Sequence, residues 1–283
     1  MKTVYTFTLI LILSACNNQN KKEKRQRISP KNNTYQLTET NTWILNNGND
    51  SQKMRIALAV NRTDSQHLIK MDSIIMPDDL SGDLEFYMHF PISVTYLKNI
   101  RKIIYFSYGT QTFATYEMGE LTYSGPTNMG KKTSQTPTGL FFTNWKAEET
   151  ISTFNDEWKL FWNFNIENKA GIGWHQYNLP GYPASSSCLR LQERDAKYLY
   201  QWANQWVLAD QTNVLIKGTP VIVFGTYQFD KKKPWLALIN QPKLLNMSDK
   251  QIKNETIHFY NHIMYEQFLR DEYQDSIKKS IEE

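Results

Sequence analysis

Residues Gly171 to Leu191 read G-I-G-W-H-Q-Y-N-L-P-G-Y-P-A-S-S-S-C-L-R-L. This stretch contains a histidine, His175, and a cysteine, Cys188, with two prolines and a glycine between them. These turn-forming residues cannot continue a helix or a central strand, so the chain turns back on itself here. We therefore expect the imidazole of His175 to approach the thiol of Cys188.

A cysteine paired with a histidine suits nucleophilic chemistry. The thiolate is the attacking form, and a free thiol with a pKa near ~8.5 is mostly protonated at neutral pH. His175 can accept the proton of Cys188, and the main-chain N–H groups of Ser187 and Cys188 can stabilise a developing oxyanion. The alternative reading is structural, because a lone cysteine followed by leucine is commonly a small core residue.

The residues around this stretch predict strands before it and a helix after it. The runs 102–108, 110–116 and 119–124 alternate apolar and polar residues between glycines, which is typical of strands joined by hairpins. Further strands are expected at 158–165 and 217–224. After Cys188, aromatic and aliphatic residues of the run 195–206 have helical spacing, so the cysteine lies just upstream of an amphipathic helix.

Composition limits the possible functions only loosely. The chain has 283 residues, enough for a large packed core, and an aromatic content of 13% that favours strands. Its formal net charge of +4 is only a weak indication of anionic partners, and no stretch resembles a nucleic-acid-binding module.

The first 16 residues resemble a bacterial lipoprotein signal peptide. Lys2 precedes a short apolar run, Leu9 to Leu13, which is far shorter than the roughly 20 residues that span a bilayer. Leu13-Ser14-Ala15-Cys16 resembles a lipobox, which implies cleavage before Cys16 and lipidation of its thiol. The alternative is an ordinary secretory signal. A lipoprotein would be exported to the cell envelope, where we expect it to be periplasmic and membrane-anchored, and it would keep Cys188 as a free thiol.

Two segments separate this signal from the strand-rich part. Residues 17–35 are rich in Asn, Gln, Lys and Arg and are expected to form a disordered tether. Residues 36–99 are expected to form a small helical accessory region, with helices near 54–62 and 63–69 and a strand ending at Pro77. This region weakly resembles a degenerate LysM-like glycan-binding unit. The alternative is a pair of helices that packs on the next domain.

An ordered set of motifs resembles a known family. The set is similar to the YkuD-type catalytic domain of L,D-transpeptidases. In chain order it consists of Ser124-Gly125, T-P-T-G-L-F from Thr136, His175, S-S-S-C-L-R from Ser185 to Arg190, Asp195-Ala196, and G-T-P-V-I-V from Gly218. The resemblance covers about residues 100–227. It implies an α+β fold that is mostly β in the catalytic domain and acts on peptidoglycan stem peptides in the bacterial envelope, without a cofactor or metal.

The resemblance also implies roles for individual residues. Cys188 takes the position of the nucleophile that attacks the carbonyl before the terminal D-alanine of a stem tetrapeptide, and His175 takes the position of its base. The resulting thioester would pass to an amine of a second stem, giving a 3-3 cross-link. Ser185 matches a Ser/Thr position that holds the cysteine loop through a turn hydrogen bond. Arg190 matches a position that either braces this loop or reads a substrate carboxylate.

Two departures from the family pattern affect the cysteine loop. The family usually reads Ser/Thr-His-Gly-Cys, whereas here Ser186 replaces the histidine and Ser187 replaces the glycine. Serine tolerates a positive φ poorly, so Ser187 restricts the backbone where an oxyanion hole must form. The separation between His175 and Cys188 is also shorter than usual. Two alternatives therefore stay open: a non-catalytic peptidoglycan-binding lipoprotein, and an L,D-carboxypeptidase or other hydrolase that uses the same thiol.

The last part of the chain, 228–283, lies outside the resemblance. It is expected to form a helical C-terminal extension that begins after Ser248 as an N-cap. His258 and His262 have a spacing able to grip a metal, but no third ligand is apparent, so they are expected to lie on the helix surface. The extension either covers the catalytic domain or contacts another protein.

Overall fold

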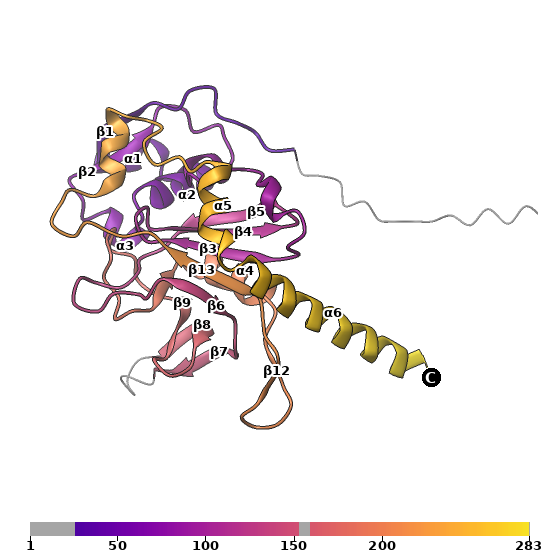
Figure 1. Cartoon of the computed structure of the whole chain (residues 1–283). Helices are drawn as coiled ribbons and strands as arrows, with labels where there is room; N and C mark the ends of the chain where they lie inside the picture. Colours follow the sequence, from indigo (N-terminus) through magenta and orange to yellow (C-terminus); the bar gives the residue numbers. More distant parts are fainter. Residues whose placement is uncertain (1–25, 153–158, 283) are drawn as a thin grey trace, which may run out of the picture.

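A computed structural model of the chain describes residues 26–152 and 159–282 (Figure 1). The predicted signal peptide, the lipobox cysteine Cys16 and residues 17–25 of the predicted tether lie outside the described residues, as does Trp158. No helix in these two described ranges has the length and apolar character needed to cross a membrane.

Two β-sheets form the centre of the molecule. The first has the strand order β5-β4-β3-β13-β6, and the second has the order β10-β9-β8-β7. The strands of the first sheet are β3 (Ile103–Ser107), β4 (Thr112–Glu117), β5 (Glu120–Pro126), β6 (Gly139–Phe142) and β13 (Pro220–Phe224). Those of the second are β7 (Lys146–Ile151), β8 (Lys159–Glu167), β9 (Ile172–Gln176) and β10 (Leu189–Leu191).

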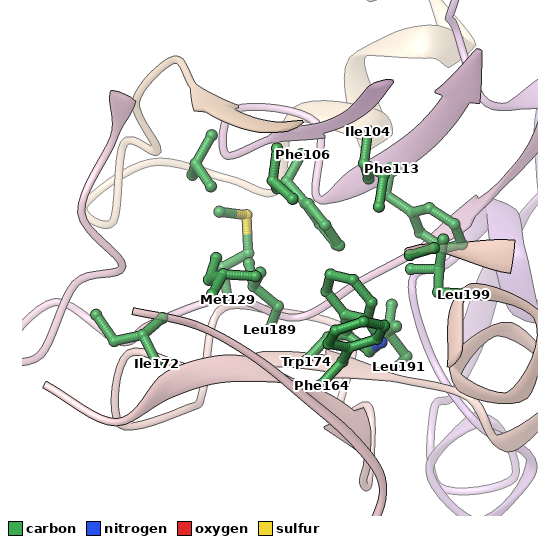
Figure 2. Packing of buried hydrophobic residues seen from close by; sticks show 14 of the residues in the cluster. Ile104, Phe106, Phe113, Met129, Phe164, Ile172, Trp174, Leu189, Leu191 and Leu199 are labelled. Carbon is green, nitrogen blue, oxygen red and sulfur yellow. The ribbon is translucent and has the colours of Figure 1, made fainter. Parts of the chain in front are cut away.

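The two sheets share one hydrophobic core. Ile104 and Phe106 of β3 face Phe164 of β8 and Trp174 of β9, and Leu199 of α4 (Glu193–Trp202) packs among them. Figure 2 shows these side chains pointing into the space between the sheets. The opposite face of the first sheet is also buried, which explains why β3 reads as a continuous apolar run.

The C-terminal extension covers that opposite face. The helix α5 (Asp249–Ile257) begins with a capping box between Ser248 and Gln251, as expected for an N-cap at Ser248. The helix α6 (Tyr260–Glu282) packs Ile263 against the sheet and then extends away from the molecule (Figure 1). The helical conformation is interrupted between α5 and α6. His258 is therefore the C-cap of α5, while His262 lies in α6.

The N-terminal region is a mixed α and β unit. Its two strands, β1 (Tyr35–Glu39) and β2 (Ser73–Pro77), pair antiparallel. Between them lie α1 (Thr40–Asn47), α2 (Ser51–Val60) and α3 (Ser65–Leu68), the last capped by Asp64. The two expected helices and the strand ending at Pro77 are present. The strand β1 was not expected, and glycan binding by this unit remains a prediction.

Two expectations about element boundaries are wrong. Residues 26–35 were expected in a disordered tether, but the main-chain N–H of Ile28 donates to Asp83 Oδ2 at 2.9 Å, and Tyr35 is a buried residue of β1. The predicted helix through Trp206 ends earlier, at Trp202, because the chain becomes extended at Ala203. The remaining short elements are η1 (Leu84–Tyr87), η2 (Thr95–Leu97), η3 (Pro234–Ile239) and the β11 (Val207–Leu208) and β12 (Val214–Ile216) pair.

The N-terminal unit is joined to the sheets through buried polar contacts. The hydroxyl of Thr63 donates to the carbonyl of Leu179 at 2.9 Å, and the N–H of Leu179 donates to Asp64 Oδ2 at 2.6 Å. The side chain of Gln192, just before α4, donates to the carbonyl of Thr63 at 2.8 Å. These contacts place α2 and α3 beside the turn that follows β9. The predicted fold class, α+β with a sheet-rich centre and helices in both terminal regions, is confirmed.

Candidate active site

The strands β9 and β10 bring His175 and Cys188 to the same face of the second sheet. They pair in parallel, with Arg190 opposite His175 and Leu189 opposite Trp174. Successive side chains of a strand point to opposite faces. Leu189 and Trp174 point into the core, as Figure 2 shows, so their neighbours His175, Arg190 and Cys188 lie on the other face.

His175 and Cys188 line one small cavity. Its volume is about 40 Å³, and its other lining residues are Ser152, Leu160, Tyr177, Ser185, Ser186 and Arg190. A cavity of this size holds a few water molecules, since a single water needs roughly 10–15 Å³ by the same measure. The thiol and the imidazole therefore meet at one site, but that site encloses very little of any peptide.

The ring of His175 is oriented by its own strand. Nδ1 lies 3.0 Å from the carbonyl oxygen of Gln176, which can only accept, so this nitrogen carries the proton and Nε2 is left as the basic atom. The ring also packs edge-to-face on Tyr177, with 5.6 Å between centroids. Burial lowers the pKa of His175 to about 4, and the nearby charge of Arg190 acts in the same direction. The imidazole is thus neutral at neutral pH and able to accept a proton.

The thiol of Cys188 is also in its neutral form. Burial raises its pKa, and this outweighs the opposing effects of a hydrogen bond with the backbone of Gly173 and the charge of Arg190. Its Sγ makes a long contact of 3.9 Å to the carbonyl oxygen of Gly171. Among the described residues, no hydrogen bond joins Sγ to the ring of His175. The resting site is therefore a neutral thiol and a neutral base on one face, and not a thiolate–imidazolium pair.

Serine residues hold the loop that presents the cysteine. The hydroxyl of Ser185 donates to the carbonyl of Cys188 at 2.6 Å and closes the turn. Ser187 has φ of +81°, a conformation that glycine adopts freely and serine adopts at a cost. Its hydroxyl lies 3.0 Å from that of Ser134, and its carbonyl accepts a hydrogen bond of 2.8 Å from Thr136.

The segment containing the T-P-T-G motif therefore supports the cysteine loop. Gly130 forms a parallel bridge with Ser185, and the N–H of Lys131 donates to the carbonyl of Ser185 at 2.9 Å. Thr136 also accepts a hydrogen bond of 2.9 Å from the N–H of Gly130. A Cβ atom at Gly130 would lie 2.2 Å from the carbonyl oxygen of Ser134, so this tight turn requires glycine.

Arg190 braces the site from the side of Tyr177. Its guanidinium carbon lies 4.4 Å from the centroid of the Tyr177 ring, and Nη1 makes a long hydrogen bond of 3.5 Å to the carbonyl of Asn178. Two neighbours of His175, Gln176 and Tyr177, thus complete the site, and no motif in the sequence indicated their roles. Of the candidate site residues, Cys188, His175, Ser185, Ser187 and Arg190 come together; Cys16 lies outside the described residues.

Comparisons with known proteins place this domain in a family. Residues 101–223 match the model of the YkuD family, described as the L,D-transpeptidase catalytic domain. The predicted resemblance to this family is therefore confirmed over residues 101–223. No curated protein matches the chain significantly.

Several solved structures are similar to part of the chain. An L,D-transpeptidase from Stackebrandtia nassauensis is 23% identical over 45% of this chain and 57% of that chain, with a TM-score of 0.37. An L,D-transpeptidase from Mycobacterium smegmatis is 19% identical over 44% of this chain and 59% of that chain, with a TM-score of 0.35. An L,D-transpeptidase from Mycobacterium tuberculosis H37Rv is 19% identical over 44% of this chain and 58% of that chain, with a TM-score of 0.35. The chain thus matches less than two thirds of the length of each of these structures.

Proposed function

We propose that the chain is a peptidoglycan L,D-transpeptidase in which Cys188 is the nucleophile and His175 the base. The observation that supports this most directly is the parallel pairing of β9 with β10, which puts both side chains in one cavity on one face of the sheet. The family match over residues 101–223 supports the same reaction class.

The first half of the proposed reaction forms a thioester. Nε2 of His175 takes the proton of the Cys188 thiol as Sγ attacks the carbonyl carbon before the terminal D-alanine of a stem tetrapeptide. The main-chain N–H groups of Ser187 and Cys188 donate to the resulting oxyanion; no described residue accepts a hydrogen bond from either of them. The intermediate collapses, the carbon–nitrogen bond breaks, and the leaving amine of D-alanine takes the proton from the imidazolium.

The second half transfers the acyl group. The amine of a neighbouring stem attacks the thioester carbonyl and gives a proton to His175, and the carbon–sulfur bond breaks. The Cys188 thiolate takes that proton back, which restores the neutral pair and leaves a 3-3 cross-link. Such cross-links would contribute to cell-wall organisation and cell shape. In this proposal the mature chain begins at Cys16 and carries a lipid there that holds it at a membrane, which a mass measurement of the purified protein tests.

The experiment that tests this function compares the wild-type chain with Cys188→Ala. We expect the wild type to convert stem tetrapeptides to cross-linked dimers and D-alanine, and the variant to lose at least about 10³-fold in rate, because no other described group replaces the nucleophile. Dimer formation is measured by mass spectrometry of the muropeptides. Undiminished dimer formation by Cys188→Ala would rule out the mechanism.

The products also separate the alternatives. Release of D-alanine with tripeptides and no dimers would show that water replaces the amine and that the enzyme is a carboxypeptidase. Binding of stem peptides without any thioester, dimer or tripeptide from the wild type would show a non-catalytic binding protein.

A further inference from the structure

The cavity at Cys188 is too small to bind a stem peptide by itself. Its volume is about 40 Å³, whereas cavities that bind small molecules usually have about 300–1,000 Å³. A substrate attacked by Cys188 must therefore make most of its contacts elsewhere. Tyr177 lines this cavity and also a second one of about 660 Å³. Tyr177 is thus the residue at which the two cavities adjoin, and a ligand that crosses it contacts both.

Four separate parts of the chain contribute to the second cavity, which we call the α2–α4 groove. The helix α2 contributes Arg55 and Leu58, β8 contributes Phe161, the turn after β9 contributes Tyr177 and Asn178, and the start of α4 contributes Arg194. One wall therefore belongs to the N-terminal unit and the other to the domain that carries Cys188. The groove combines apolar surface from Leu58 and Phe161 with the positive charge of two arginines.

The other charged groups of the groove already have partners. Asp64 caps α3 through the N–H of His67 at 2.9 Å and also accepts from Leu179, as described above. Glu193 forms an ion pair of 2.6 Å with Lys197. Lys159 forms one of 2.7 Å with Glu149. These pairs leave little negative charge free in the groove.

The two arginines are not neutralised in this way. No described acidic residue forms an ion pair with Arg55 or Arg194. Arg55 donates through Nη2 to the hydroxyl of Tyr123 at 3.0 Å, and that hydroxyl donates to Asp195 at 2.6 Å. Asp195 is buried behind Tyr123, and the charges of both arginines act on it. Most guanidinium N–H donors of the pair thus remain available to a ligand.

We propose that the α2–α4 groove binds the carboxylate-bearing part of a peptidoglycan stem peptide while the reacting carbonyl of the same peptide lies at Cys188. This inference rests on the proposed function. Guanidinium groups bind carboxylates through paired, charge-assisted hydrogen bonds, and a peptide stem carries several carboxylates. The apolar side chains of Leu58 and Phe161 contact the backbone and side chains between them. The N-terminal unit then supplies one wall of the substrate site.

The proposal is tested by binding measurements in the full-length chain carrying Cys188→Ala, which removes turnover. The probe is a stem tetrapeptide, measured by isothermal titration calorimetry beside the same peptide with its carboxylates amidated. We expect Arg194→Gln to weaken binding of the free-acid peptide about tenfold, because one charge-assisted hydrogen bond is worth about 1.5 kcal/mol. The amidated peptide should bind more weakly and should be insensitive to this substitution.

A second substitution and a matched control complete the design. Arg55→Gln should act like Arg194→Gln, and Arg55→Lys should recover part of the loss because the charge remains. Arg101→Gln is the control, since Arg101 is an exposed arginine in a different cavity, paired with Asp271. Equal affinity of Arg194→Gln and Arg101→Gln, equal binding of the free-acid and amidated peptides, or no binding of the tetrapeptide would each overturn the proposal.

The binding and cross-linking experiments together distinguish a failure of the groove proposal from a failure of the proposed transpeptidase function. Arginine-dependent binding by Cys188→Ala, together with a wild-type chain that forms no thioester, supports the groove and rejects the transpeptidase mechanism. Cross-linking by the wild type, together with an affinity that ignores both arginines, supports the mechanism and rejects the groove.

Discussion

Burial determines the protonation of both reactive groups. His175 is 5% exposed, and burial lowers its pKa to about 4 while it raises that of Cys188. An imidazole that is neutral at pH 7 cannot stabilise a resting thiolate by its charge. In the proposed mechanism it removes the proton during attack, so the thiol would be activated only when a substrate is in place.

This arrangement predicts the pH dependence of thiol alkylation. The rate at which iodoacetamide modifies Cys188 follows the thiolate fraction, which rises about tenfold per pH unit below the thiol pKa. Because burial raises that pKa above the ordinary value of a free thiol, the rate should climb from about pH 6 to about pH 9 without a plateau. The measurement is mass spectrometry of the alkylated peptide containing Cys188.

His175→Gln provides the control for that profile. It should leave the shape of the curve unchanged, because the neutral imidazole contributes no charge to hold a thiolate. A plateau below about pH 7 that disappears in His175→Gln would instead reveal an ion pair and contradict the neutral resting state.

At the scale of elements, the cysteine loop has a serine, Ser187, in a backbone conformation that is usual for glycine. Ser187 has φ of +81°, so the shape expected from glycine at this position is retained at an energetic cost. Contacts from Ser134 and Thr136 maintain this shape. The replacement of glycine therefore leaves the loop conformation in place and changes its stability.

The cost can be measured by comparing two substitutions. Ser187→Gly and Ser187→Ala both lose the hydroxyl contact with Ser134, but only alanine keeps the strain of the left-handed conformation. We expect the glycine variant to have a free energy of unfolding about 1 kcal/mol higher than the alanine variant, measured by urea denaturation.

Ser186 is the matched control for this comparison. It is an exposed neighbour without a positive φ, so there alanine should be the more stable variant by about 0.4–1 kcal/mol. If the alanine variant were more stable than the glycine variant at both positions, the backbone of Ser187 would be unstrained.

The elements that the sequence predicted well are those with strong local patterns. The alternation in β3 and β4 and the capping residue Ser248 are such signals, and each element lies within a few residues of its expected position. The helix after Cys188 was expected to reach Trp206, because spacing alone continues the apolar pattern past Ala203. The strand β1 was missed since it depends on pairing with the distant strand β2.

The same distinction applies to the site. A cysteine and a histidine around a turn-rich segment could be recognised from residue types, as could the motifs around them. The support of the loop by Gly130 and Ser134, and the groove formed with α2, depend on contacts between segments far apart in the chain. No local pattern contains that information.

At the scale of the whole molecule, a buried arginine joins the N-terminal unit to the first sheet. Nε of Arg62 donates to the carbonyl of Thr110 at 3.0 Å, and Nη1 donates to the carbonyls of Ala59 at 3.1 Å and Val60 at 2.6 Å. Its guanidinium carbon lies 5.1 Å from the ring centroid of Trp235. Burial lowers the pKa of Arg62 to about 9, so it keeps its charge at neutral pH without an ion pair to any described acid.

Loss of this arginine should destabilise the whole molecule. Arg62→Ala removes three hydrogen bonds to buried carbonyl groups and leaves a cavity against Trp235, which should lower the free energy of unfolding by about 3–5 kcal/mol. Calorimetry should show one transition, shifted to lower temperature, because the two parts share these contacts.

Arg101→Ala serves as the comparison. Arg101 forms an exposed ion pair with Asp271. Its replacement by alanine should lower the free energy of unfolding by less than about 1 kcal/mol. Two separate transitions, with only one of them moved by Arg62→Ala, would show that the N-terminal unit unfolds independently.

The pairing of β9 with β10 has a consequence for how related chains can differ in sequence. The lateral distance between the imidazole and the thiol is set by hydrogen bonds between two adjacent strands, and the residues that connect these strands, 177–188, do not determine it. Insertions and deletions in that turn can therefore accumulate while the reacting atoms stay in register. A search keyed to a fixed number of residues between histidine and cysteine would overlook members such as this one, whereas one keyed to strand register would retain them.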